Sequence, residues 1–170
     1  VTVSTSVTAN ISSFDLEHLA GTVAIKNTDC TFGNRHFHSG WMNLTSHETD
    51  GYKTVELNSD LVDAALTGYF GIADLPLVAR DFCDRYIPMY YNPFRNADSA
   101  DLSALYEDQF NIQVRWLDPS NQLAQLVPGL MVSPEATFHG SYNYGESLRM
   151  VFVADEIRYN SMSFNSIGLN

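Results

Sequence analysis

The sequence is poor in cationic side chains, and this scarcity excludes a large class of partners. Nine Lys and Arg stand against 20 Asp and Glu, which gives a formal net charge of −11. A surface that binds nucleic acid needs clustered cations to neutralise phosphates. The composition therefore argues against a DNA- or RNA-binding protein.

Cysteines and long apolar runs are also scarce. Cys30 and Cys83 are too few for a disulfide framework, and we expect buried free thiols, with a single bridge between them as the alternative. No apolar run approaches the roughly 20 residues that a membrane-spanning helix needs, and no basic-then-apolar leader is present. The chain opens with VTVSTSV and not with Met, which favours an internal segment of a longer protein whose targeting or anchoring parts lie elsewhere.

Motifs of common catalytic and metal sites are missing as well. The stretch GYFG lacks the spacing and the following Lys or Ser of a phosphate loop. His139 lies near Ser141, but without the strand, turn and helix of a nucleophile elbow. His36 and His38 would share one face of a strand, yet a structural zinc site needs four ligands and no second pair is evident.

The acidic side chains offer no catalytic pair either. Asp155 and Glu156 are adjacent, so on a strand they point to opposite faces, and Asp60 with Asp63 fits a turn and a solvated face. We therefore predict that the chain is not an enzyme and that it holds neither a cofactor nor a metal ion.

The sequence does contain repeated two-residue alternation, the mark of half-buried strands. It is clearest at residues 110–116, FNIQVRW, and recurs at residues 1–7 and 20–27. Many such runs separated by Gly, Asn and Asp predict a mainly β fold with an antiparallel sheet that has one covered face.

Three short helices are predicted between the strands. The first begins near Asp74, which can cap it, and ends at Pro88, with apolar residues at helical spacing. The second covers residues 98–109, and the third covers residues 121–129, where Pro128 and Gly129 end it. We expect these helices to cover one end or edge of the sheet.

One alternating run changes phase. In TVELNSDLVDAALTGYF, residues 54–70, the apolar positions resume one residue out of step after Asp60. The same change recurs 95 residues later, at Asp155 in MVFVADEIRY. A strand keeps one apolar face through such a slip only if it bulges or bends, so we predict a recurring corner in a repeating β-structure. The repeat divides the chain into a β-unit at 1–72, a helical insertion at 73–109 and a second β-unit at 110–170.

The order of these pieces resembles one family of envelope proteins. A Gly-containing strand (LAGTVAIKN), the slipped strand leading into a Pro-marked helix, and then QLVPGLMVSPEATFHGSYNYGESLRMVFVADEIRY are together similar to the TamB branch of the AsmA-like proteins, in their Bacteroidetes form. The resemblance covers most of residues 19–170. It is weakest in the first fifteen residues and around NPFRNADSAD.

The resemblance implies a fold and a function. Such proteins form a β-taco, a long sheet folded into a U-shaped trough, and are anchored in the inner membrane while they cross the periplasm toward a TamA- or BamA-like outer-membrane protein. They are linked to phospholipid transport between the membranes and to outer-membrane protein assembly. No catalytic group is implied, and the ligand would be the phospholipid acyl chain. The candidate groove-lining residues are Val23, Ile25, Val55, Leu57, Val62, Ala64, Leu66, Ile112, Val114, Trp116, Met150, Phe152, Ile157 and Tyr159.

Alternation alone favours a closed core over an open groove, and only the family resemblance reverses this preference. The alternative is therefore a β-sandwich-like extracellular module for carbohydrate or protein ligands, with Trp41, Tyr90 and Tyr91 as stacking aromatics. A conduit predicts an open apolar groove. A binding module predicts a closed core and a small polar cleft.

Overall fold

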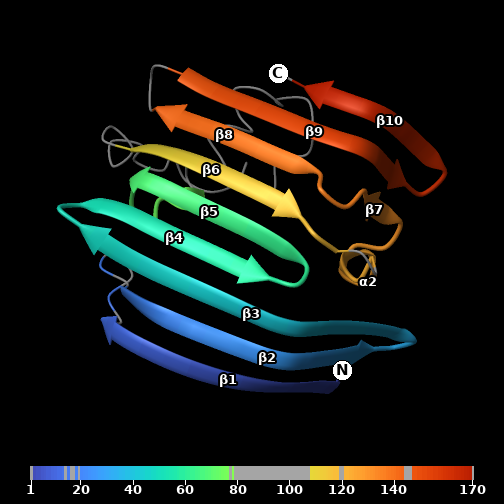
Figure 1. Ribbon diagram of the computed structural model, residues 1–170, viewed down its shortest axis with the longest axis horizontal. Helices are drawn as coiled ribbons and strands as arrows, with labels where there is room; N and C mark the ends of the chain where they lie inside the picture. The colour runs from blue at the N-terminus through green and yellow to red at the C-terminus, as the bar shows by residue number, and fades with distance from the viewer. Residues whose placement is uncertain are drawn as a thin grey trace, which may run out of the picture.

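The fold is one large antiparallel sheet. The computed structural model describes residues 2–13, 15, 18, 20–76, 78, 108–118, 121–143 and 147–169. Ten strands lie in the order β1-β2-β3-β4-β5-β6-β8-β9-β10, and the short β7 pairs with β9 (Figure 1). Their bounds are Thr2–Ser13, Ala20–Phe32, Arg35–Thr49, Tyr52–Ser59, Val62–Tyr69, Gln109–Trp116, Leu130–Val132, Thr137–Asn143, Ser147–Tyr159 and Met162–Leu169 for β1 to β10. The mainly β, antiparallel prediction is confirmed.

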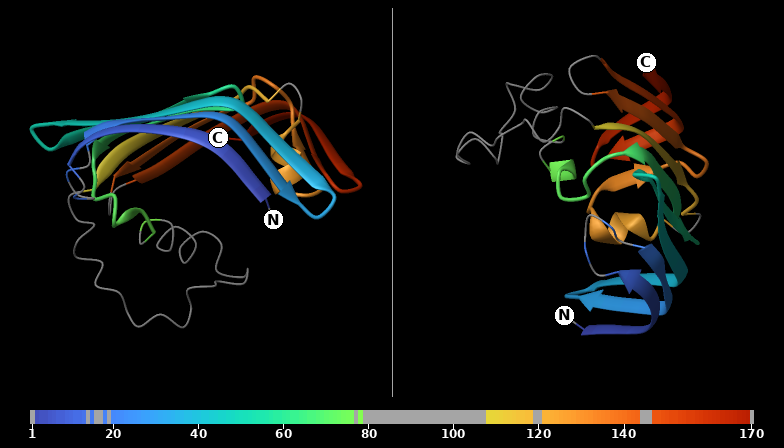
Figure 2. Two further views of the ribbon diagram at one scale, coloured as in Figure 1. Left: turned by 90° about the horizontal axis from the view of Figure 1, so that it is seen from below. Right: turned by 90° about the vertical axis from the view of Figure 1, so that its left-hand side faces the viewer.

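The sheet is curved but neither closed nor strongly curled. In the described part of the chain β1 and β10 are its two edges, and they do not pair with each other. Figure 2 shows the long strands arching, with the segment that follows β5 and the short helix α2 both on the concave side. The described residues thus form a single layer, and not the two facing sheets of a sandwich.

Helical structure is limited where the structure describes the chain. The amide of Val78 donates to the carbonyl of Asp74 at 3.0 Å, so a helix begins where Asp74 was predicted to cap it. The third predicted helix is α2, the single turn Leu123–Leu126, and Gly129 follows it at a φ of 81°. The rest of the first helix and nearly all of the second, residues 98–109, lie outside the described residues, except that Gln109 belongs to β6.

The change of phase at Asp60 is a hairpin and not a corner within one strand. Asn58 lies opposite Asp63 in the pairing of β4 with β5, so Asp60 and Leu61 form a two-residue loop between antiparallel neighbours. Residues that flank such a loop face each other, and they project to the same side although they are three apart in sequence. The reversal therefore keeps the apolar face, but the prediction of a strand that continues through the slip was wrong.

Two side chains fix this hairpin. Ser59, whose side chain is fully buried, accepts hydrogen bonds from the amides of Leu61 and Val62 at 3.1 and 2.9 Å and donates to the Val62 carbonyl at 2.7 Å. The carboxylate of Asp60 accepts from the Gly40 amide at 2.7 Å and from the Ser39 hydroxyl at 2.8 Å. The loop is thereby tied to β3.

Asp60→Asn should lower the free energy of unfolding at neutral pH. It should also make this free energy depend less on pH in the acidic range. Burial acts to raise the pKa of Asp60, but hydrogen bonds from the Gly40 amide, the Ser39 hydroxyl and nearby backbone groups outweigh it and leave the pKa below its usual value. A depressed pKa stabilises the fold above the unfolded-state pKa of about 4, and this contribution is lost as pH falls through the folded-state pKa. Urea unfolding should show a deficit of about 1 kcal/mol at pH 7 that closes below about pH 4. A deficit that stays constant down to pH 2 would contradict this role of the carboxylate.

The second change of phase, at Asp155, is a bulge inside β9. The amides of Asp155 and Glu156 both donate to Ser133 Oγ, at 3.2 Å each. Successive amides of a regular strand point to opposite edges, so two that share one acceptor indicate a bulge. The second change of phase therefore lies within one strand, as a bulge, and whether it forms a repeating corner stays a prediction.

A similar irregularity lies in β2 and β3. Asn27 has a φ of 51°, and the pairing of β2 with β3 omits the position where it would meet Gly40. On β3 the more buried side chains are Phe37 and Ser39 before Gly40 and Met42 after it, so the alternation shifts there. The alternation therefore shifts within β2, β3 and β9.

The 95-residue repeat does not hold in three dimensions. Its first slip is a hairpin loop and its second is a bulge within a strand. Gly21 resembles Gly68, within the same predicted β-unit: the two have φ of 151° and 147°, and a Cβ on either would collide with the backbone of the adjacent strand. The division into two β-units stays a prediction, although β5 and β6 from the two units are adjacent in one sheet.

Candidate functional site: the apolar face of the sheet

The register of the strands places the predicted lining residues in rows across the sheet. Cross-strand partners project to the same face, so each row can be followed from strand to strand. One row, here called the central row, crosses seven strands and is apolar throughout: Val23, Leu44, Leu57, Ala64, Val114, Phe138 and Phe152. Its register continues to Ala9 on β1 and Leu169 on β10.

Two flanking rows add most of the remaining candidates. Val55, Leu66, Ile112 and Met150 belong to one of them, and Ile25, Val62 and Trp116 to the other. Twelve of the fourteen predicted residues thus share one face, which we call the inner face. Val55 and Leu66 pack against the same buried cluster as Ile72 and Leu75 of the segment on the concave side, so the inner face is the concave one (Figure 2).

Ile157 and Tyr159 lie beyond the bulge in β9. They are opposite Phe164 and Met162 on β10 and opposite Val132 and Leu130 on β7, respectively. The structure therefore groups them with a second apolar patch and does not place them in the rows that the other twelve form.

A buried cluster covers one end of the inner face, and the side chains of the central row are half-buried. Phe70, Val78, Phe110 and Tyr142 form a buried cluster there, with 5–8 % of each residue exposed. Phe110 stacks on Tyr142 with 5.1 Å between ring centroids and meets Phe70 edge-on at 5.8 Å. All seven side chains of the central row, in contrast, are only half-buried.

A buried cation lies beside the covered end. Lys53 is 9 % exposed as a residue. Its ammonium donates to the Phe70 carbonyl at 2.9 Å and lies 5.9 Å from the centroid of the Phe70 ring. The charge is held by the backbone at the rim of the aromatic cluster, so it does not enter the central row.

Sequence reasoning missed several residues of this face, among them Met42, Leu44, Phe138 and Tyr142. The signal was present for the last two, because FHGSYNY alternates as a strand does. Gly140 explains the irregular size pattern there, since a Cβ on it would lie 2.7 Å from Ile112 Cγ2. Ile112 fills the space that the glycine leaves.

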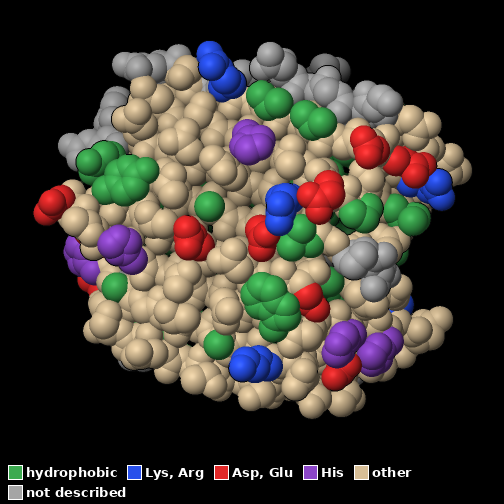
Figure 3. All heavy atoms as spheres, in the orientation of Figure 1, with side chains coloured by type: hydrophobic (Ala, Val, Ile, Leu, Met, Phe, Trp, Pro, Cys, Tyr) green, Lys and Arg blue, Asp and Glu red, His purple; other side chains and the backbone are tan. Residues whose placement is uncertain are grey.

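The opposite face is largely polar, although it also exposes Trp41, Tyr52, Tyr69 and Val153. Figure 3 shows acidic and basic side chains gathered in its middle. A shallow hollow of about 310 Å³ lies over β4, β5, β6 and β8, and its lining includes Glu56, Asn58, Asp63, Gln113, Arg115 and His139. Arg115 pairs with Asp63 at 3.2 Å. The predicted solvated role of Asp63 is consistent with this exposed ion pair.

The acidic residues of the second slip are separated from those of the first. Hydrogen bonds from Arg158, at 2.8 Å, and from Ser163, at 2.9 Å, hold the pKa of Glu156 below its usual value. Asp155 lies in the bulge of β9, whereas Asp60 lies in the hairpin loop between β4 and β5. No acid–base pair is formed from the predicted residues.

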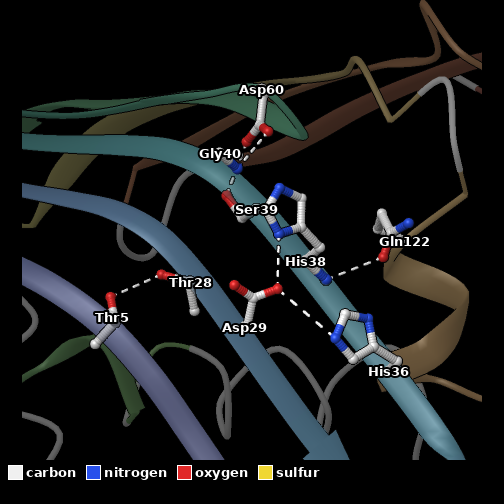
Figure 4. Close-up of polar contacts among 9 residues, drawn as sticks. All are labelled: Thr5, Thr28, Asp29, His36, His38, Ser39, Gly40, Asp60 and Gln122. Carbon is white, nitrogen blue, oxygen red and sulfur yellow. Dashed lines mark hydrogen bonds and ion pairs between the residues drawn. The ribbon is translucent and has the colours of Figure 1, made fainter.

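His36 and His38 share one carboxylate rather than a metal-ion site. Asp29 Oδ1 lies 2.9 Å from His38 Nδ1 and 3.6 Å from His36 Nε2, and the His38 amide donates to Gln122 at 3.0 Å (Figure 4). Among the described residues no group of three or more His, Cys, Asp or Glu could hold a metal ion. Cys30 is a free thiol, and Cys83 lies outside the described residues.

Comparisons with protein-family models, with curated proteins and with solved structures gave no match. Within the described residues, no helix has both the length and the hydrophobicity needed to span a membrane. The apolar inner face is thus the feature from which a function has to be argued.

Proposed function

We propose that the inner face binds the acyl chains of phospholipids, and that the chain is a segment of a periplasmic bridge in which this face forms part of a lipid-conducting groove. The observation that carries the proposal is the central row, which is apolar on seven successive strands and half-buried on each. A groove for acyl chains needs such an uninterrupted apolar path and no catalytic group.

The energetics favour this use of an apolar path. Exposing an acyl chain to water costs about 0.8 kcal/mol for each CH₂, so moving one tail through water meets a barrier on the order of 10 kcal/mol. Side chains such as Leu57 and Phe138 can replace the lost hydrocarbon contacts, while a headgroup stays hydrated beyond the sheet. A charged residue within the row would reintroduce part of the barrier.

The envelope setting and the partners come from the resemblance to TamB. On that basis the sheet belongs to a U-shaped trough, the parent protein is anchored in the inner membrane, and a BamA- or TamA-like protein receives it at the outer membrane. The primary role is then phospholipid transport, outer-membrane protein assembly, or both. The curvature of the sheet and its single layer support the trough, because they leave the apolar face on a concave side (Figure 2).

The two tryptophans provide a direct test, because they lie on opposite faces. Trp116 is opposite Val62 on the inner face, whereas Trp41 follows the opposite alternation to Met42 and is 42 % exposed. Bromine atoms on acyl chains quench tryptophan on contact. In Trp41→Phe, which retains Trp116, fluorescence should fall when phospholipid with brominated acyl chains is added.

The matched variant is Trp116→Phe, which retains Trp41 and should show little quenching by the same lipid. Equal quenching of both variants would indicate nonspecific adsorption. Quenching of Trp41 alone would place the lipid on the polar face. Either of these results, or quenching of neither tryptophan, would refute acyl-chain binding by the inner face.

A further inference from the structure

Two hollows adjoin on the polar face. The larger one, described above, has a volume of about 310 Å³, and a second one of about 150 Å³ lies over β6, β8 and β9. Gln113 and His139 line both hollows and are cross-strand partners on β6 and β8. The two hollows therefore meet at this pair, and together we call them the polar depression.

The charges of the polar depression cancel. It is lined by two carboxylates and two guanidinium groups, those of Glu56, Asp63, Arg115 and Arg149, whereas the whole chain carries a formal charge of −11. The other polar side chains can both donate and accept hydrogen bonds. They are Asn58, Asn111, Gln113, Thr137, His139 and Ser141. The depression thus offers many hydrogen-bonding groups but no excess charge for a strongly anionic or cationic ligand.

Several of these groups are exposed and available to a ligand. Arg115 pairs with Asp63 at 3.2 Å, which holds the guanidinium in place. The side chains of Glu56, Gln113 and Arg149, in contrast, are exposed and make no hydrogen bond or ion pair with any described residue. A ligand can therefore bind these three groups without breaking contacts that the described part of the chain already makes.

Small apolar side chains lie among these polar groups. One cross-strand row of the polar face runs from Glu56 through Ala65, Gln113 and His139 to Val151 on β9. Its four steps of about 4.8 Å give a span of roughly 19 Å. Sugar rings carry hydroxyls at their edges and C–H groups on their faces, so polar groups around Ala65 and Val151 suit a short run of linked sugar units.

We propose that the polar depression binds a neutral polysaccharide, with a few linked sugar units lying across β4, β5, β6, β8 and β9. Sugar hydroxyls both donate and accept hydrogen bonds, and a neutral glycan brings no charge that the acidic chain would repel. An extended peptide fits less well, because peptides bind mainly by adding a strand to a free sheet edge or by placing apolar side chains in pockets. The depression lies over strands that are paired on both sides, and its hollows are shallow.

Binding to an array of immobilised oligosaccharides tests the proposal. The array carries neutral oligomers of glucose, mannose and N-acetylglucosamine, together with uronic-acid oligomers. The fluorescently labelled chain should bind at least one neutral series and should bind the uronic acids less. Gln113→Ala should lower the affinity for the best neutral oligomer about tenfold, because the bound sugar then lacks a hydrogen-bond partner at the point where the two hollows meet.

The matched control is Gln109→Ala, which removes the same group from the same strand and face but outside both hollows. It should bind the oligomer as the unmodified chain does. No binding to any neutral oligomer, a preference for uronic acids, or equal weakening by the two substitutions would overturn the proposal. The inner face is unchanged in both variants, so brominated phospholipid should still quench Trp116. A failure of glycan binding therefore leaves the proposed function standing.

Discussion

Phe110→Ala should lower the free energy of unfolding by about 3–5 kcal/mol, an unusually large loss for one side chain. Phe110 is 8 % exposed and joins Phe70 to Tyr142 in the buried cluster. A single-layer sheet buries few side chains completely, so the cluster at its covered end carries much of the packing energy. The alanine would leave a cavity that neighbouring aromatic rings cannot fill. Urea unfolding followed by far-ultraviolet circular dichroism measures the change.

The matched control is Phe164→Ala, which removes the same atoms from β10, where the side chain is 52 % exposed. We expect a loss of less than about 1 kcal/mol there. If both substitutions shift the unfolding midpoint equally, the covered end is no more important to stability than the open edge, and the assignment of the cluster as the core is wrong.

Leu57→Asp should weaken the binding of phospholipid at least about tenfold while the sheet stays folded. Leu57 lies in the centre of the central row, between Leu44 and Ala64. A carboxylate at this position must lose water when an acyl chain covers it. The cost of that desolvation appears only in the lipid-bound state, because the side chain is half-buried in the free protein.

Two further variants keep this prediction decisive. Asn58→Asp adds the same charge to the polar face one residue away and should bind lipid normally. Met150→Asp alters the inner face at a residue that is 38 % exposed, so it should fold even if the Leu57 variant does not. If the folded inner-face variants bind lipid normally, the central row is not a path for lipid.

The sequence was informative about faces and less informative about connections. Alternation predicts that Ile112, Val114 and Trp116 share one side of a strand. This prediction depends only on the local geometry of β6 and not on its neighbours in the sheet. The same pattern cannot distinguish a bulge from a two-residue hairpin. In both, two apolar residues that are an odd number of positions apart in sequence project to the same face. The hairpin at Asp60 depends on hydrogen bonds to the Ser59 hydroxyl and on those that the Asp60 carboxylate accepts from β3. A pattern of apolar and polar residues does not predict such bonds.

Long-range pairing explains the remaining differences. The bulge at Asp155 uses Ser133, 22 residues away, as its acceptor, so no local pattern reveals it. The adjacency of β5 and β6 across residues 70–108 likewise depends on the register of the whole sheet. The alternation of residues along each strand predicts most of the candidate face, whereas the positions of Phe138 beside Val114 and of Tyr142 beside Phe110 follow from the pairing of β8 with β6.

Site-specific photo-crosslinking in cells tests lipid contact with the inner face most directly. A photoreactive amino acid at Leu57 should capture phospholipid in the intact protein, and one at Glu56, the adjacent residue on the polar face, should capture far less. The pair shares a strand and differs only in the face it presents. Equal capture at both positions, or none at Leu57, would contradict a lipid path along the inner face.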